Sequence, residues 1–309
     1  MKTRLYGLSY FRWARSWVAF IIAMAILAAF WFGCYWVIER YTPEQNLIYF
    51  KIGAWGAGIL GLLMLIFNEP IVVLTMGCVR VRQREDCPEL WDAVHAVTPV
   101  LAYPVPRIYV VLEGGMNAFS FGWGLPFFSA VAATRGLIRK LDEDELKAVM
   151  AHEVGHILNK DILVSMALTI TVMMTAFTGW LILRFGTVFG GSKSDSSDSK
   201  GGLGKVVAFL ALLAIGLSMY IFGRLLGYIL QMFVSRQREY AADATAARIM
   251  GSGRPLVAAL EKIVGDPSIG GQKVGAAFGF MCAVDPQPDD LMATHPSMKN
   301  RVNALLAME

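Results

Sequence analysis

Two histidines and a glutamate have the spacing of a metal site in the stretch "KAVMAHEVGHIL". His152, Glu153 and His156 form H-E-x-x-H. Residues four apart lie on one face of a helix, so both imidazoles can bind one tetrahedral ion. The glutamate beside the first histidine can then reach a water molecule activated by that ion. A chance match is the alternative, but two of the 4 histidines in the chain lie in this motif. The spacing predicts one Zn²⁺ per chain, with Glu153 as the catalytic base.

The third metal ligand must come from another segment, because catalytic zinc usually takes three protein ligands and keeps one position open. "SRQREYAADATAARIM" offers Glu239 and Asp243, again four residues apart. Glu239 is a candidate ligand, and Asp243 is then placed to accept a hydrogen bond from a ligand histidine and fix its tautomer. A solvated face of charges is the alternative, since Arg236 and Arg238 lie nearby. Spacing alone leaves both open.

The segments around these residues predict an α+β, mostly helical fold with a small β-sheet. "CPELWDAVHAV" has a helical pattern with Pro88 at its start, and "PRIYVVLE" and "FFSAVAAT" have strand composition. Between them, "GGMNAFSFG" is a short extended run. Asp142 and Glu145 form a variant of the capping box before the H-E-x-x-H helix. The last part of the chain is expected to be mostly helical, with breaks at 251–255 and 265–271.

Long apolar runs predict an integral membrane protein. The chain is 56% hydrophobic and 17% charged, with a mean hydropathy of +0.51. The apolar residues gather in four runs, at 17–38, 47–67, 162–183 and 206–223. A helix needs about 20 apolar residues to cross the hydrocarbon layer, so we expect about four transmembrane helices. A second hairpin that only partly enters the bilayer, or packs as a soluble core, is the open alternative.

Positive residues set the expected orientation, because they favour the cytoplasmic side. They cluster before the first run and after the second: Lys2, Arg4, Arg12, Arg15, Arg80, Arg82 and Arg84.

The first run is longer than the core of a cleavable signal peptide, which favours an uncleaved anchor. The predicted organisation is a membrane hairpin at 1–79, a first catalytic part at 80–161, a second hairpin at 162–234 with a flexible, disordered Gly/Ser-rich linker at 184–205, and a second catalytic part at 235–309.

Two other classes of site are not indicated. The net charge of +4 is modest, and no basic stripe interleaved with aromatics suggests a nucleic-acid partner. The 4 cysteines are scattered without a C-x-x-C pair, so neither a disulfide framework nor a thiolate metal site is predicted.

"AHEVGHILNKD" together with "SRQREYAADATAA" resembles the HtpX-type membrane zinc metallopeptidases, relatives of the CAAX prenyl proteases. "NAFSFG" and "THPSMKNRVNALL" resemble two further segments of that family, so the resemblance covers nearly the whole chain. It implies a zincin-like (gluzincin) domain with Glu239 as the third zinc ligand and Asp243 behind it. It also implies that Asn117, Ala118 and Phe119 form an edge strand that holds substrate backbone. His295 and Arg301 would neighbour the active site, with His295 stabilising the oxyanion.

The resemblance implies a membrane-anchored zinc endopeptidase, facing the cytoplasm at the cell inner membrane. Its partners would be the lipid bilayer and polypeptides, above all misfolded or damaged membrane proteins, in a stress-response and quality-control role.

The candidate ligands lie close to the apolar runs in the chain. From His156 to Ile162 is six residues, about 9 Å if the helix continues, and from Arg224 to Glu239 is 15 residues, about 22 Å on the same assumption. Catalysis would thus lie close to the headgroups.

Two other functions are alternatives to a metallopeptidase. A membrane scaffold or transporter could carry a structural zinc, but such sites usually have four protein ligands, often cysteines, and no cysteine lies near His152. A prenyl-protein protease is the other, although those relatives have more spans around a large chamber.

Overall fold

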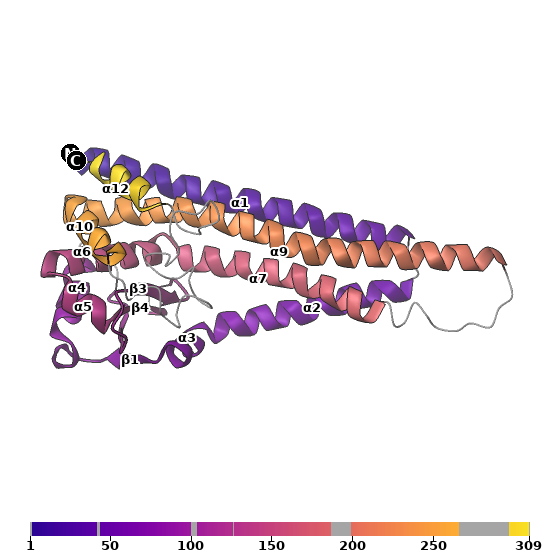
Figure 1. The fold of residues 1–309 in the computed structure, drawn as a ribbon, viewed down its shortest axis with the longest axis horizontal. Coiled ribbons are helices and arrows are strands. Elements are labelled where there is room, and N and C mark those ends of the chain that lie inside the picture. The colour runs from indigo at the N-terminus through magenta and orange to yellow at the C-terminus, as the bar shows by residue number, and fades with distance from the viewer. Residues whose placement is uncertain are drawn as a thin grey trace. The chain divides into compact units, whose positions relative to one another are not determined.

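The structure is a computed structural model that describes residues 2–41, 44–99, 104–125, 127–186, 199–265 and 297–308. The chain divides into two compact units. The first comprises Met1–Ala19, Phe67–Ser165 and Met232–Glu309, and the second comprises Phe20–Ile66 and Met166–Gln231. Helices dominate and one small sheet is present, so the prediction of a mostly helical α+β chain is confirmed (Figure 1).

Long apolar helices make up the second unit. They are the corresponding parts of α1 (Lys2–Tyr41), α2 (Glu44–Ile66), α7 (Asp161–Leu181) and α9 (Ser199–Met250), with a π-helical turn, η3, at Ile182–Gly186. Trp31 Nε1 of α1 donates to Thr175 Oγ1 of α7 at 2.8 Å. Cys34, Ile182, Ile215 and Met219 form one buried cluster. This unit is therefore a helical bundle with an apolar interior.

By length and composition, two helical stretches among the described residues can cross a membrane. They are Phe20–Val37 and Asp161–Arg184, and a third candidate is a bent pair, Ala54–Leu63 with Asn68–Met76. The predicted run at 206–223 lies inside α9. The prediction of a membrane protein agrees with these helices, whereas four full spans stay a prediction.

The sheet of the first unit has four strands in the order β1-β2-β4-β3. The strands are β1 (Cys78–Val81), β2 (Arg107–Val111), β3 (Ala118–Gly122) and β4 (Ser129–Thr134). β2 and β4 are parallel, while β1–β2 and β3–β4 are antiparallel. β2, β3 and β4 match the predicted extended segments. β1 was not predicted, because its four residues lie between an apolar run and a charged segment and show no clear alternation.

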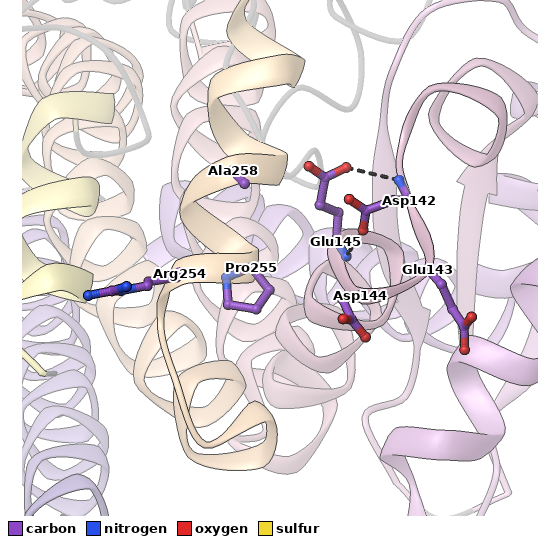
Figure 2. A pocket seen from close by; sticks show the side chains of 7 residues that line it. All are labelled: Asp142, Glu143, Asp144, Glu145, Arg254, Pro255 and Ala258. Carbon is purple, nitrogen blue, oxygen red and sulfur yellow. Dashed lines mark hydrogen bonds between the residues drawn. The ribbon is translucent and has the colours of Figure 1, made fainter.

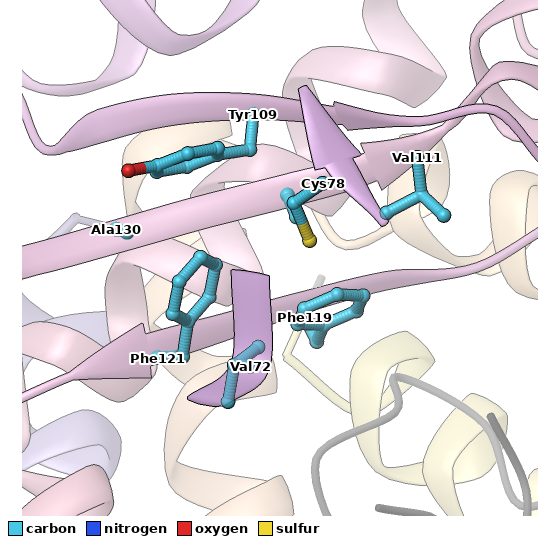
Figure 3. Packing of buried hydrophobic residues seen from close by; sticks show 8 residues of the cluster. Val72, Cys78, Tyr109, Val111, Phe119, Phe121 and Ala130 are labelled. Carbon is cyan, nitrogen blue, oxygen red and sulfur yellow. The ribbon is translucent and has the colours of Figure 1, made fainter. Parts of the chain in front are cut away.

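One face of this sheet is closed by α3 (Asn68–Met76). Figure 3 shows the resulting apolar cluster, in which Val72 of α3 packs with side chains from all four strands. The members are Val72, Cys78, Tyr109, Val111, Phe119, Phe121, Ala130 and Ala132. Side chains alternate between the faces of a strand, so the intervening residue Ser120 lies on the other face of β3.

Six further helical segments of the first unit pack on one another and on the sheet. They are η1 (Arg84–Asp86), α4 (Pro88–Val97), α5 (Arg135–Lys140), α6 (Glu143–Leu158), α10 (Arg254–Val264) and α12 (Met298–Leu306). α6 contacts α4, α10, β3 and β4. It is thus the central helix of the unit, and most of its residues are buried.

The start of α6 is fixed by the predicted capping box. The backbone N–H of Glu145 donates to the Asp142 carboxylate, and the N–H of Asp142 donates to the Glu145 carboxylate, each at 2.9 Å (Figure 2). Both carboxylates line a pocket that Arg254, Pro255 and Ala258 of α10 complete. Because this pocket lies at the first turn of α6, it does not include the histidines two turns further along.

The structure corrects the expectation that the H-E-x-x-H helix continues into the following apolar run. α6 ends at Leu158, and Lys160 adopts a left-handed backbone conformation with φ 63° before α7 begins at Asp161. The condition behind the estimate of about 9 Å from His156 to Ile162, a continuous helix, therefore does not hold. α9, by contrast, runs without a break from Ser199 past Glu239 to Met250.

The expected linker at 184–205 is also corrected at both ends. Its first residues belong to the π-helical turn that ends at Gly186, and its last residues belong to α9 from Ser199 on. Helix propagation from a long stable segment costs much less than nucleation, so glycines and serines can be included at a helix end. Residues 187–198 lie outside the described residues.

Candidate metal centre

Three side chains from two helices converge on one point. His152 and His156 come from α6 and Glu239 comes from α9, and one ligand atom of each lies within 4.8 Å of the others. The two Nε2 atoms are 3.1 Å apart. Each lies 3.5 Å from a carboxylate oxygen of Glu239. The structure thus brings together the three residues that the sequence predicted as metal ligands.

These distances fit a tetrahedral zinc ion. Ligand atoms that each lie 2.0–2.1 Å from such an ion are about 3.3 Å apart, close to the separations found here. The set of two imidazoles and one carboxylate is also a known donor set of catalytic zinc, which leaves the fourth position open. Both the donor chemistry and the spacing of the donor atoms therefore suit zinc.

Each histidine has a carboxylate at its other ring nitrogen. His152 Nδ1 lies 3.0 Å from Asp243, and His156 Nδ1 lies 2.8 Å from Asp161. A carboxylate that accepts from Nδ1–H leaves the lone pair of Nε2 for a metal. Asp243 was expected in this role. Asp161 was missed, although it comes only five residues after His156, because an unbroken helix would have turned it away.

The electrostatics of the cluster favour a positive charge between the histidines. Burial opposes protonation of His152, but the carboxylates of Asp243 and Glu239 outweigh it and raise the pKa of His152 to about 10. Two neutral Nε2 lone pairs 3.1 Å apart would repel each other. A cation at the shared point relieves this repulsion, so the site is built for a bound positive charge.

Arg301 of α12 holds both carboxylates of α9. Its guanidinium donates to Asp243 through Nε at 3.0 Å and Nη2 at 2.7 Å, and Nη1 lies 3.3 Å from Glu239. Burial opposes ionisation of Asp243, but Arg301 and His152 outweigh it and lower the pKa of Asp243. The structure therefore places Arg301 beside the candidate ligand Glu239, where the family resemblance implies it. His295, the other residue predicted from this segment, lies outside the described residues.

Glu153 lies beside the candidate ligands and is 1% exposed. Burial raises the pKa of Glu153, while the neighbouring His152 and His156 act in the opposite direction. Ser120 of β3 forms a hydrogen bond with its carboxylate. The hydroxyl donates, because an ionised carboxylate has no proton to give. Ser120 was not predicted as a site residue, since only the fold brings residues 33 positions apart into contact.

A glycine allows α6 and α9 to approach closely enough for one ion to join them. A Cβ at Gly155 would lie 3.3 Å from Thr245 Cβ and 3.4 Å from Ala242 Cα. These distances are tighter than most real Cβ contacts. The absence of a side chain at Gly155 therefore sets the separation between the helix that carries the histidines and the helix that carries Glu239.

Arg238 of α9 joins that helix to the start of α7. It is buried, donates through Nη1 to the backbone carbonyl of Asp161 at 2.6 Å, and forms a hydrogen bond with Ser165. A solvated charged face, the alternative for this stretch, is therefore wrong for Arg238. The guanidinium fixes the start of α7, and with it Asp161.

The predicted substrate strand is the terminal strand of the sheet among the described residues. Ala118 and Phe119 are the first two residues of β3, and Asn117 comes directly before them. Within the described strands, β3 pairs with β4 only. All three residues are buried. The backbone N–H of Asn117 donates to Thr134 Oγ1 at 2.9 Å, which ties this end of β3 to β4.

Comparisons with known proteins agree with this geometry. Residues 86–309 match the model of peptidase family M48. A protease HtpX homolog from Leuconostoc citreum is 32% identical over 273 residues, which is 87% of this chain and 89% of that protein. One from Streptococcus gordonii is 31% identical over 304 residues, covering 95% and 96%.

A solved structure shows a related fold. The crystal structure of S. mikatae Ste24p has a TM-score of 0.55 over 94% of this chain and 67% of that one, at 18% sequence identity. The family model and the two protease HtpX homologs confirm the resemblance to HtpX-type metallopeptidases and disfavour a non-enzymatic scaffold or transporter. The chain belongs to peptidase family M48 and is a membrane-anchored metalloprotease.

Proposed function

We propose that this chain is a zinc-dependent endopeptidase that cleaves misfolded or damaged membrane proteins at the cytoplasmic side of the cell inner membrane. The observation that carries the proposal is the convergence of His152, His156 and Glu239 on one point, with the Glu153 carboxylate beside them. Matched relatives are described as proteases, which supports the same reaction class.

The candidate ligands would hold one zinc ion per chain. When bound, zinc acts as a Lewis acid toward a carbonyl oxygen and lowers the pKa of a bound water to about 7. Asp243 and Asp161 keep the two imidazoles in the tautomer that presents Nε2 to the metal. Arg301 holds Glu239 and Asp243 in place through buried ion pairs.

Glu153 would act as the general base and then as the general acid. Its carboxylate takes a proton from the attacking water as the new C–O bond forms at the substrate carbonyl. The same proton passes to the amide nitrogen as the C–N bond breaks. Ser120 orients the carboxylate through its hydrogen bond. Burial favours the protonated form of Glu153 that exists between these two proton transfers, because the charged carboxylate loses solvation.

Substrate would bind along β3. A peptide added to a terminal strand is recognised mainly through its backbone, with little demand on side-chain identity. β3 carries Ser120, the residue in contact with Glu153, so a peptide on this strand would pass close to the catalytic base. Backbone recognition of this kind predicts broad cleavage specificity, which suits a quality-control role.

The expected orientation has both catalytic parts in the cytoplasm and four spans. Support comes from the positive residues that precede the first apolar run and follow the second. Trypsin provides a direct test, because Lys193 lies between the third and fourth runs. Added to intact spheroplasts, trypsin should cut at Lys193 and leave the catalytic parts whole. Cleavage only in inverted vesicles would contradict this orientation.

The decisive activity experiment compares the wild-type chain with Glu153→Gln in detergent, with zinc added and casein as an unfolded substrate. The wild type should cleave casein, and the variant should bind zinc equally but lose activity by about 10²-fold or more, as for a lost general base. Equal cleavage by both would defeat the role of Glu153. Zinc absent from both, measured by elemental analysis, would defeat the metal centre.

A further inference from the structure

The loop between β3 and β4 presents large apolar side chains to the outside. Phe127 is 75% exposed, Phe128 54% and Leu125 37%. No charged residue occurs between Trp123 and Phe128. We call Leu125, Phe127 and Phe128 the loop tip. Clustered exposed apolar side chains in a folded unit mark a surface that meets another apolar partner.

Hydrogen bonds and a ring contact among Trp123, Leu125 and Phe128 hold this loop. The Trp123 N–H donates to the Phe128 carbonyl at 2.8 Å, and the Phe128 N–H donates to the Leu125 carbonyl at 3.1 Å. The rings of Trp123 and Phe128 stack with centroids 5.7 Å apart. Phe127 has φ 66°, which is unfavourable for a bulky side chain. The fold therefore maintains a strained backbone with an aromatic ring on its outer side.

The base of this loop packs against the first turn of α7. Lys160 Nζ donates to the Gly124 carbonyl at 3.0 Å. A Cβ at Gly124 would lie 3.5 Å from Ile162 Cβ and 3.8 Å from Leu163 Cγ, and the φ of Gly124 is +62°. A side chain here would be strained and would crowd α7. Gly124 thus lets the loop lie directly on the residues where the apolar helix begins.

The same strand end is tied to the chain that follows α2. The Gly122 N–H donates to Asn68 Oδ1 at 2.9 Å, and Asn68 is the first residue of α3. α7 contains the stretch Asp161–Arg184, which is long and apolar enough to cross a membrane. The loop tip therefore extends from the place where the chain passes from the catalytic unit into its apolar helices.

We propose that the loop tip inserts into the bilayer interface, where Phe127, Phe128 and Leu125 contact lipid. The inference rests on the proposed membrane-spanning role of α7. Exposed Phe and Leu side chains are the kind that bury at the boundary between headgroups and acyl chains. The Lys160 amine at the loop base suits the level of the anionic headgroups. Lipid fits better than a second copy or a peptide, because the base of the loop packs on the first turn of a candidate span. The tip would fix β3, and thus the substrate strand, at the membrane surface.

Photo-crosslinking from the loop tip tests the proposal. The full-length chain is made with p-benzoylphenylalanine in place of Phe127 and reconstituted in nanodiscs of phosphatidylethanolamine and phosphatidylglycerol. Two matched positions are labelled in separate chains: Phe177, which is 36% exposed within α7, and Asp144, whose side chain is 76% exposed at the start of α6. After illumination, mass spectrometry identifies adducts, and casein cleavage checks that each chain is folded.

Phospholipid adducts at positions 127 and 177, and none at 144, are the expected result. Adducts at 177 alone would overturn the loop-tip proposal and leave the membrane span intact. No adduct at 177 would show that the proposed span itself fails, whatever position 127 does. A crosslink from 127 to a second copy of the chain would identify a protein partner and overturn the assignment to lipid.

Discussion

His156 Nδ1 lies 2.8 Å from the Asp161 carboxylate, across a helix break at Lys160. The break turns the first residue of α7 back toward the end of α6. Arg238 then holds the Asp161 carbonyl from α9. One side of the metal centre therefore depends on a backbone turn, and the other side depends on the Arg301–Asp243 ion pair.

Replacing Asp161 should weaken metal binding. Asp161→Ala removes the acceptor that fixes the tautomer of His156, and loss of such a partner typically costs about 10–100-fold in metal affinity. Zinc affinity measured by competition with a chelator should fall by that factor. Asp144→Ala, an exposed carboxylate at the start of α6, is the matched control and should leave the affinity unchanged. Equal affinities in all three chains would contradict the role of Asp161.

Ser120→Ala should reduce turnover without reducing zinc affinity. The substitution removes the hydroxyl that donates to Glu153. One hydrogen bond to a charged group contributes about 1.5 kcal/mol or more, so kcat should fall roughly tenfold or further. Ser120→Thr keeps the hydroxyl and should recover part of the rate. A fall in zinc content, or a change confined to KM, would mean that Ser120 serves another purpose.

Gly155 should tolerate alanine far better than leucine. A Cβ alone requires Ala242 and Thr245 to move by a few tenths of an ångström, whereas a leucine side chain would force α9 away from α6. Overpacking of this kind costs about 1–3 kcal/mol and moves Glu239 away from the histidines. Gly155→Leu should therefore lose both thermal stability and zinc, as measured by Tm and by elemental analysis. Retention of stoichiometric zinc in Gly155→Leu would contradict this role.

Arg301→Gln should destabilise the chain, and more so without metal. The substitution leaves the buried carboxylates of Asp243 and Glu239 without their guanidinium partner. Removing one partner of a buried ion pair typically costs about 3–5 kcal/mol. Zinc would supply a positive charge to Glu239, so the fall in Tm should be smaller with zinc than after chelation. Equal falls under both conditions would argue against a shared cation at Glu239.

Local patterns accounted for much of the centre. The spacing of His152 and His156 and of Glu239 and Asp243 predicted which side chains share a helical face, since that depends only on helix geometry. The Asp142–Glu145 capping box, the Pro88 helix start and three of the strands were also predicted correctly. Each of these features is formed by residues close together in the chain.

Features that depend on distant contacts were missed. β1 is a strand because it pairs with β2, and Ser120 touches Glu153 because β3 packs on α6. The alternative of a solvated face at Arg238 stayed open in the sequence, because nothing near Arg238 in the chain showed that it would contact α7. The assumption of an unbroken helix also concealed Asp161.

The sequence by itself determined the pair of candidate histidine ligands and the membrane character, because short-range spacing and long apolar runs indicate both. The choice of Glu239 as the third ligand came from the family resemblance. Only the tertiary structure decided how the centre is held. The close approach at Gly155, the turn at Lys160 and the ion pairs of Arg301 are formed between segments far apart in the chain. Their energies depend on burial and on contact distances, which exist only after those segments have packed together.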